Sequence, residues 1–229
     1  MLVEKNSAQK SKQHTVYKNK DGVRVPGTTT ITGVMEKPAL VPWANKLGLQ
    51  GIEVGKYVDD LATIGTLAHY LIECHIRSQI EGKKIEPDLS DYTPNQVDSA
   101  ENCFIKFIDW ESKNKVVYLK SELGLVSETY QFGGTVDAYA IVNGRKTLLD
   151  FKSCKGIYSE HFTQVAGGYS VLLIDNGLPV EDIRIIRVGR TEEEGTEAEE
   201  RQASQVDLHV KRFHICRELY EVNKLLNRK

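Results

Sequence analysis

The sequence has few cysteines, and none of them is paired at a metal-binding spacing. The four cysteines stand far apart, at positions 74, 103, 154 and 216. Without a Cys-x-x-Cys pair, neither a zinc site nor an iron–sulfur cluster held by cysteines is expected. Scattered thiols fit a reducing compartment, so we expect unpaired cysteines and a cytoplasmic location.

Long apolar runs and a marked excess of charge are also lacking. No apolar stretch approaches the ~18 residues of a membrane span, so we expect no membrane contact. The first dozen residues, MLVEKNSAQKSK, have no apolar segment of a secretory signal. We expect residues 1–16 to form a flexible N-terminus and residues 17–229 a single domain. The net charge is −2, so binding a phosphate backbone would need basic residues gathered locally.

Apolar periodicity divides the chain into helical and strand-like parts. Helices are expected over 38–51, 59–82, a segment opened by Thr93 and Pro94, 159–177 with Ser159 as N-cap, and a C-terminal stretch of about 27 residues. Residues 25–35 are expected to form a short strand or an extended segment, and strand patterns cover 116–131, 134–142, 146–153 and 182–190. The acidic run 192–200 is expected to be a solvated loop. A helix between two strands implies a parallel pair, so this order predicts an α/β fold with a mixed central sheet flanked by helices.

One predicted hairpin brings two carboxylates together. The dipeptide Asn143-Gly144 between two strand patterns is a strong signal for a two-residue turn. That turn places Asp137 directly opposite Asp150, on one face of the sheet, with Cβ atoms about 5 Å apart. Lys152 shares the face. Like charges this close are destabilising unless compensated, and Mg²⁺ or Mn²⁺ is the natural compensator because hard cations favour carboxylate oxygens.

This cluster suits metal-assisted hydrolysis of a phosphodiester. A bound metal ion polarises the phosphoryl oxygen and lowers the pKa of a water, and Lys152 would steady the developing negative charge. The alternative is a surface ion pair of Asp150 with Lys152 beside a solvated Asp137. An Asp-x-Lys pattern is weak by itself, because the looser Glu-x-Lys also occurs at 81–83 and 111–113.

Four segments together resemble a known family. GGTVDAYAIVNGRKTLLDFKS (133–153) resembles the signature of the PD-(D/E)XK nuclease superfamily, and within it the RecB-like exonuclease branch, which includes the mitochondrial genome-maintenance exonuclease and many phage nucleases. GTLAHYLIE (65–73) is similar to the upstream helical motif of that branch, and QVAGGY (164–169) to the motif after the lysine strand. VPGTTTITGVMEKPALVPWANKLG (25–48) looks like the N-terminal segment of phage members. The resemblance covers roughly residues 17 to 190.

The resemblance implies a fold, a cofactor and roles for individual residues. The fold would be restriction-endonuclease-like, with an αβββαβ core. The cofactor would be Mg²⁺ or Mn²⁺. No iron–sulfur cluster is expected, because the sequence lacks the cysteine cluster of the iron–sulfur members. By resemblance, the metal ligands are His69, Asp137, Asp150 and the main-chain carbonyl of Phe151. The resemblance also implies that Lys152 is the catalytic lysine. Gln164 and Tyr169 would then position the site or the DNA.

Further residues have two interpretations from the sequence. His69 and Glu73 share a helix face. Either His69 is a metal ligand with Glu73 as its acidic neighbour, or the histidine lies at the edge of a packed helix. Gln164 neighbours two glycines, which would also allow close packing of the helix on the sheet. If the chain turns at 133–134, Glu128 faces Tyr139 and shares the face of the aspartates.

Three basic residues are candidates for a phosphate track beside the site: Lys155, Arg187 and Arg190. The function expected is a metal-dependent DNA exonuclease that acts on linear or single-stranded DNA in DNA processing, recombination or repair. Phage origin would place it in the host cytoplasm, with a recombination or single-strand-binding protein as a partner. The alternatives are a structure-selective endonuclease on the same fold, and a non-catalytic module that binds DNA or a protein partner.

Overall fold

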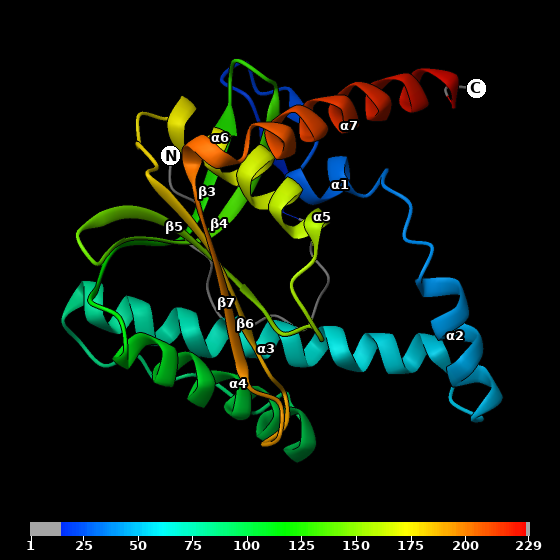
Figure 1. Ribbon diagram of the computed structural model, residues 1–229, viewed down its shortest axis with the longest axis vertical. Coiled ribbons are helices and arrows are strands. Elements are labelled where there is room, and N and C mark those ends of the chain that lie inside the picture. The colour runs from blue at the N-terminus through cyan, green and yellow to red at the C-terminus, as the bar shows by residue number, and fades with distance from the viewer. Residues whose placement is uncertain (1–14, 228–229) are drawn as a thin grey trace.

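The computed structural model describes residues 15–227, so the expected flexible N-terminus at 1–16 lies almost wholly outside the described residues. Its centre is a five-stranded sheet in which neighbours along the sheet are also neighbours in sequence (Figure 1). The strands are β3 Val116–Ser127, β4 Phe132–Val142, β5 Arg145–Lys152, β6 Asp182–Val188 and β7 Thr196–Gln202. Only β5 and β6 run parallel, so the sheet is mixed, as predicted.

Helices cover both faces of this sheet (Figure 1). One face carries α3 Val54–Glu81 and α4 Pro94–Ser112, packed on strand residues such as Ala140, Leu149 and Phe151. The other face carries α1 Thr28–Thr32, α5 Ser159–Phe162, η1 Thr163–Tyr169, α6 Ser170–Asp175 and α7 Asp207–Leu226. The α/β fold class and the αβββαβ order are therefore confirmed. No helix within the described range is long and apolar enough to cross a membrane.

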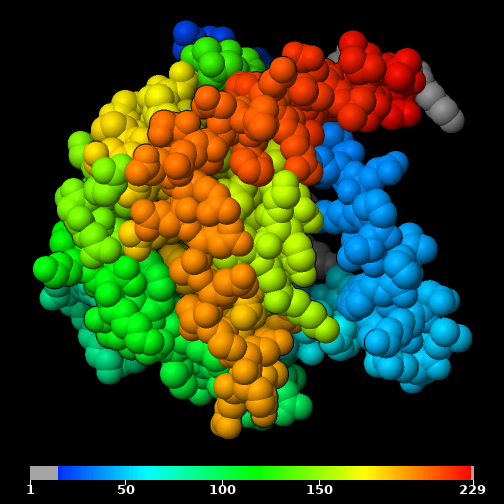
Figure 2. Space-filling view, viewed as in Figure 1, coloured from blue at the N-terminus to red at the C-terminus, as the bar shows by residue number. Residues whose placement is uncertain are grey.

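Two smaller elements lie outside these layers. A two-stranded ribbon pairs β1 Tyr17–Lys18 with β2 Arg24–Val25. Helix α2 Leu40–Leu49 has no buried residue and packs on the N-terminal part of α3, where Trp43 meets Tyr57. In the space-filling view it stands apart from α5 (Figure 2).

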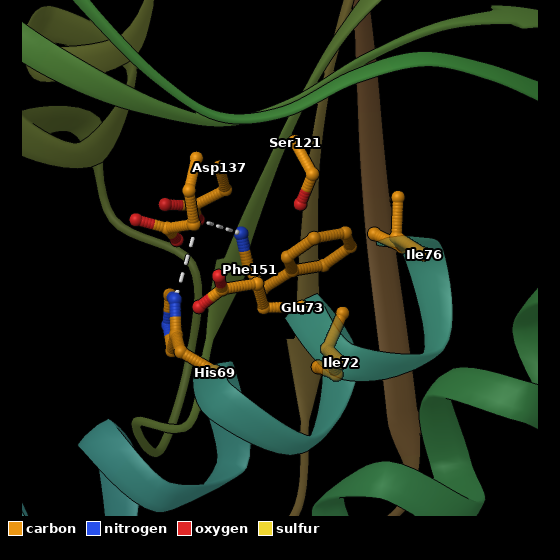
Figure 3. Close-up of a pocket in the computed structure, with 8 residues that line it drawn as sticks. His69, Ile72, Glu73, Ile76, Ser121, Asp137 and Phe151 are labelled. Atoms are coloured by element: carbon orange, nitrogen blue, oxygen red, sulfur yellow. Dashed lines mark hydrogen bonds and ion pairs between the residues drawn. The ribbon is translucent and has the colours of Figure 1, made fainter. Parts of the chain in front are cut away.

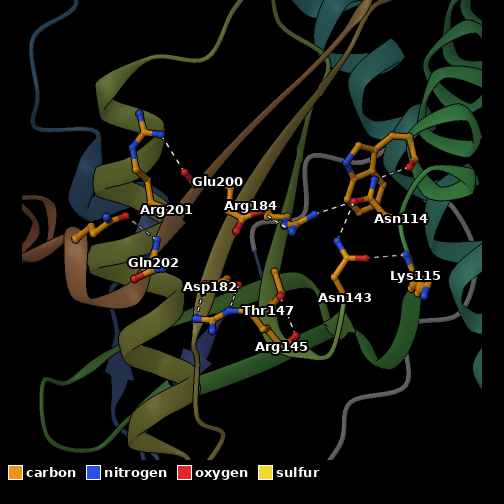
Figure 4. A network of polar contacts seen from close by, with 12 residues as sticks. Asn114, Lys115, Asn143, Arg145, Thr147, Asp182, Arg184, Glu200, Arg201 and Gln202 are labelled. Atoms are coloured by element: carbon orange, nitrogen blue, oxygen red, sulfur yellow. Dashed lines mark hydrogen bonds and ion pairs between the residues drawn. The ribbon is translucent and has the colours of Figure 1, made fainter.

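Local signals set the bounds of the two long helices. Thr93 and Gln96 form a reciprocal capping box at the start of α4, with Pro94 in its first turn, as the sequence predicts. Helix α3 ends where Gly82 takes a left-handed conformation, with φ 65°. At the far end of α4, Asn114 accepts a hydrogen bond from Arg184 of β6 and contacts Asn143, which fixes the β4–β5 turn (Figure 4).

The short strand or extended segment predicted over 25–35 is wrong beyond Val25 of β2, because Thr28–Thr32 is a short helix. Its threonines favour a strand by propensity, but tertiary contacts override that preference. The Thr28 hydroxyl donates to the carbonyl of Gly133, and Ile31 is fully buried in the core.

The solvated loop predicted over 192–200 is also partly wrong, because β7 begins at Thr196. The strand lacks an apolar face because it is an edge strand that neutralises charges of its neighbour. Arg184 and Arg187 of β6 pair with Glu200 and Glu197. Edge strands commonly carry charge, which also prevents pairing with other chains.

The helix predicted over 159–177 is present but is not one α-helix. Its N-cap is Tyr158 rather than Ser159, and residues Thr163–Tyr169 form a π-helix between α5 and α6. The two glycines allow close packing there: a Cβ at Gly167 would lie 2.2 Å from Phe213 Cβ, and one at Gly168 would lie 2.2 Å from Thr28 Cγ2. The glycines therefore do allow close packing, but against helices α7 and α1 rather than against the sheet as predicted.

Candidate active site

The hairpin between β4 and β5 has the predicted register. Asn143 and Gly144 both have positive φ, 50° and 87°, as a two-residue type I′ turn requires. The ladder runs from Val142–Arg145 to Ala138–Leu149. It stops there, because Asp137 turns its carboxylate onto the neighbouring strand, where Oδ2 accepts a hydrogen bond of 2.9 Å from the amide of Phe151. The next position in this register after Ala138–Leu149 is Asp137–Asp150.

Asp150 is a buried carboxylate held against Lys152. Only 1% of the Asp150 side chain is exposed, and its Oδ2 lies 2.6 Å from Lys152 Nζ. Burial raises the pKa of Asp150 to about 6; the Lys152 charge opposes the rise and the Asp137 charge adds to it. Burial disfavours the charged form of Lys152 too, but the two carboxylates outweigh it and raise the pKa of this lysine. The surface interpretation of this ion pair is therefore wrong.

Asp137 also meets groups from α3 and β3. His69 Nδ1 lies 3.6 Å from Asp137 Oδ2 (Figure 3). The His69 ring stands edge-on to the Phe151 ring, which fixes its orientation. Glu122 of β3 joins them: one ligand atom from each of His69, Glu122 and Asp137 lies within 4.8 Å of the others.

The π-helix brings Gln164 and Tyr169 together beside the carboxylates. In a π-helix hydrogen bonds join residues five apart, and these two residues have that spacing. Gln164 Nε2 donates to the Tyr169 hydroxyl at 2.8 Å. Burial raises the pKa of Tyr169 well above its usual value, and the charges of Asp150 and Asp137 add to the rise. The phenol is therefore neutral and close to both aspartates.

Other candidate residues lie at the margin of this cluster. Glu73 lines the pocket beside His69 and pairs with Arg77 at 3.5 Å. The pairing expected for Glu128 is wrong: Tyr139 pairs with Lys120, because β3 and β4 turn at 128–131 rather than at 133–134. The Glu128 carboxylate instead accepts from the amide of Lys20.

The three basic candidates do not gather at the aspartates. Lys155 is exposed in the loop after β5. The Arg187 guanidinium is held by Glu197 and the Gly195 carbonyl, and the amide of Arg190 bonds to Glu194. A phosphate track through these residues would need Arg187 to exchange partners.

Glu122 is a site residue that the sequence did not indicate. The polar run Glu128–Gln131 is the sequence signal for the turn between β3 and β4. The turn alone does not determine which residues of β3 and β4 face each other. An irregularity between Tyr118 and Lys120 shifts the pairing by one residue, and only beyond it do Ser121–Ala138 and Leu123–Val136 bracket Glu122 and Asp137.

The donor set fits a hard divalent cation. Carboxylates of β3 and β4 and one imidazole come within 4.8 Å of one another, and the charges of Asp137 and His69 also act on Asp150 of β5. Oxygen-rich sets of this kind hold Mg²⁺ or Mn²⁺. The buried Asp150 Oδ2 is ion-paired with Lys152, and a carboxylate has further lone pairs with which it could bind a ligand. None of the four free cysteines belongs to this group.

Comparisons with known proteins give only distant likenesses. No protein-family model matches the chain, and no curated protein matches it. LHK-Exo in complex with dAMP has a TM-score of 0.36 and 11% identity, over 72% of this chain and 88% of that chain. The alkaline exonuclease (LHK-Exo) from Laribacter hongkongensis gives 0.33 and 12%, with the same coverage. SSO0001 gives 0.29 and 12%, over 65% of this chain and 72% of that chain.

Proposed function

We propose that this chain is a metal-dependent DNA exonuclease of the PD-(D/E)XK type that hydrolyses phosphodiester bonds with water as the nucleophile. The observation that carries the proposal is the buried Asp150–Lys152 pair next to Asp137, on two strands joined by a two-residue turn. Burying a charged pair costs several kcal/mol per ion before compensation, so such a pair beside a further carboxylate and a histidine favours function over packing.

The proposed metal ligands are His69, Asp137, Asp150 and the main-chain carbonyl of Phe151, with Mg²⁺ or Mn²⁺ as the ion. A bound ion would polarise the phosphoryl oxygen and lower the pKa of the attacking water. The chain holds these donors before any ligand arrives: Asp137 is fixed by the Phe151 amide, and His69 by the Phe151 ring. Such preorganisation removes the cost of ordering the groups during reaction.

Lys152 would supply the positive charge that the transition state needs. Its ammonium is held 2.6 Å from Asp150, and the carboxylates keep it protonated at neutral pH. From there it would donate a hydrogen bond to the attacking water or a phosphate oxygen, where negative charge develops. Gln164 and the neutral Tyr169 would donate further hydrogen bonds beside Asp150.

The exonuclease form and the biological setting follow from the family resemblance. Within that resemblance, linear or single-stranded DNA is the substrate, recombination or repair the process, and phage infection a fitting context. A recombination or single-strand-binding protein would be the partner.

The test is release of nucleotides from end-labelled linear single-stranded DNA in Mg²⁺ or Mn²⁺, with closed circular DNA alongside. Lys152→Ala should abolish release. Lys113→Ala is a matched control, because Lys113 belongs to a Glu-x-Lys sequence but pairs with Asp109 on the surface of α4. Its activity should equal that of the wild type.

Each outcome has one meaning. Cleavage of the linear DNA alone, lost with Lys152→Ala and with chelator, supports the exonuclease. Cleavage of the circle as well would replace it with an endonuclease on the same fold. Binding of DNA without metal-dependent cleavage would contradict the proposal in favour of a non-catalytic module.

A further inference from the structure

A second pocket lies on the other face of the sheet, where α5, β7 and the start of α7 meet (Figure 2). Its volume is about 230 Å³, well above the roughly 30 Å³ share of one water. None of the residues that line it belongs to the proposed metal site, and none lines the small pocket beside His69 and Asp137. A ligand in this pocket would therefore have its own binding residues.

The alternation of β7 directs two charged side chains toward this pocket. Arg201 pairs with Ile183 in the sheet register, and Glu199 pairs with Ile185. Both isoleucines are buried in the core under α5 and α7, so their partners on β7 lie on that face too. Arg201 Nη2 lies 2.9 Å from Glu199 Oε2, and the guanidinium carbon is 5.0 Å from the centre of the Phe162 ring. The carboxylate and the ring hold this guanidinium in place before any ligand arrives.

Helix α7 adds a second arginine and a histidine. His209 and Arg212 are three residues apart, so they share one side of the helix. Arg212 donates a hydrogen bond of 2.9 Å to the Ser159 hydroxyl, and it makes no ion pair with any carboxylate of the described residues. His209 Nδ1 lies 3.4 Å from Thr163 Oγ1, which leaves Nε2 as the ring nitrogen for the pocket. Burial lowers the pKa of His209, and the charges of Arg212 and Arg201 lower it further, so both guanidinium groups act on this ring.

The pocket and its rim suit a phosphate group joined to an aromatic ring. Two guanidinium groups face one carboxylate, and each guanidinium has a fork of N–H donors that matches two phosphate oxygens. The Ser159 hydroxyl accepts from Arg212, so its own hydrogen is free to donate. The Tyr158 ring also lines the pocket and is 49% exposed. Exposed aromatic rings beside positive charge are surfaces on which nucleobases stack.

We propose that this pocket binds a nucleoside monophosphate, with the phosphate held by Arg201 and Arg212 and the base against Tyr158. The source of this group is either a free nucleotide or the 5′-terminal nucleotide of a DNA strand. The proposal does not depend on the proposed function, because no metal ligand takes part in it. Glu199 opposes binding, since its negative charge lies against Arg201 and repels the phosphate.

The test is isothermal titration calorimetry with thymidine 5′-monophosphate, in chelator so that no metal ion holds the nucleotide at the aspartates. Arg212→Ala should weaken binding about tenfold or more, because charge-assisted hydrogen bonds are lost. Arg212→Lys keeps the charge and should recover part of the loss. Arg217→Ala is the matched control on the same helix, because Arg217 pairs with Glu221 and bonds to Gln131 of the β3–β4 turn. Its affinity should equal that of the wild type.

Glu199→Gln separates a phosphate site from a purely structural cluster. Removing this negative charge should tighten binding of thymidine monophosphate, whereas loss of a structural contact would weaken it or leave it unchanged. Thymidine without its phosphate should bind more weakly than the monophosphate. An oligothymidylate with a 5′ phosphate identifies the source. If it binds and Arg212→Ala weakens that binding, the source is a DNA end, and if only the monophosphate binds, the source is the free nucleotide.

Three results would overturn the proposal. They are no binding of thymidine monophosphate by the wild type in chelator, equal binding of thymidine and its monophosphate, and an unchanged affinity in both Arg212→Ala and Glu199→Gln. None of them concerns metal-dependent cleavage, so the proposed function would stand. Loss of cleavage with Lys152→Ala would likewise leave this pocket unaffected.

Discussion

Replacing Lys152 with methionine should leave Asp150 as an uncompensated charge in the core. The two groups lie 2.6 Å apart, and the side chains are 19% and 1% exposed. Removing one partner of a buried pair typically costs 3–5 kcal/mol. Because Lys152 is partly exposed, we expect the lower end, about 3 kcal/mol of unfolding free energy at pH 8 without metal.

The loss should depend on pH in a definite direction. The folded protein raises the pKa of Asp150 to about 6, mainly through burial, above the value of an unfolded aspartate. The native state therefore binds the proton more tightly than the unfolded chain, and this group gains stability as pH falls through its folded pKa. Removing the Lys152 charge raises this pKa further. At pH 5 the neutral carboxyl needs no counter-charge, so the cost of Lys152→Met should be smaller than at pH 8.

The assay is urea denaturation of metal-free protein at pH 5 and pH 8 for four chains: wild type, Lys152→Met, Asp150→Asn and the double variant. The double variant should regain most of the stability lost at pH 8, since neither charge of the pair remains. Equal losses at both pH values, or a double variant as unstable as Lys152→Met, would refute the reasoning.

Three further predictions follow from other parts of the molecule. Gly167→Ala would place a Cβ 2.2 Å from a carbon of Phe213, and it should lower the free energy of unfolding by about 1–3 kcal/mol in urea denaturation. In the control Gly124→Ala the new Cβ meets nothing within 4 Å, so the free energy of unfolding should not change. Equal effects of the two substitutions would contradict the close packing at Gly167. Thr93→Ala should lose about 1 kcal/mol in the same assay by removing the cap of α4, and a neutral result would count against the capping box. The rise in unfolding temperature given by Mn²⁺ should shrink as pH falls below about 6, because protonation of Asp150 competes with the ion. A rise at pH 5 as large as the rise at pH 8 would count against Asp150 as a ligand.

The parts of the fold that were predicted have strong local signals. Asn143-Gly144 alone determines a two-residue turn, and the turn determines which residues of β4 and β5 face each other. Thr93 and Pro94 likewise determine the start of α4. These signals are carried by two or three residues each, so no information about the remainder of the fold is needed.

The parts that were missed depend on tertiary contacts. The Thr28–Thr32 segment is helical because of bonds to β4, which its own residues do not reveal. Strand β7 has no apolar face, so it is recognisable only beside the arginines of β6. Glu122 enters the site through a positive φ and a register shift, and neither has a sequence signature.

The most direct test of the account is cleavage of end-labelled linear single-stranded DNA in Mn²⁺ by Asp137→Asn, with Asp109→Asn as control. Asp137 is the residue at which the proposed ligands meet, whereas Asp109 is an exposed carboxylate of α4. The wild type and Asp109→Asn should cleave, and Asp137→Asn and chelated wild type should not. Cleavage by Asp137→Asn at the wild-type rate, or cleavage in the presence of chelator, would contradict a metal-dependent nuclease centred on this residue.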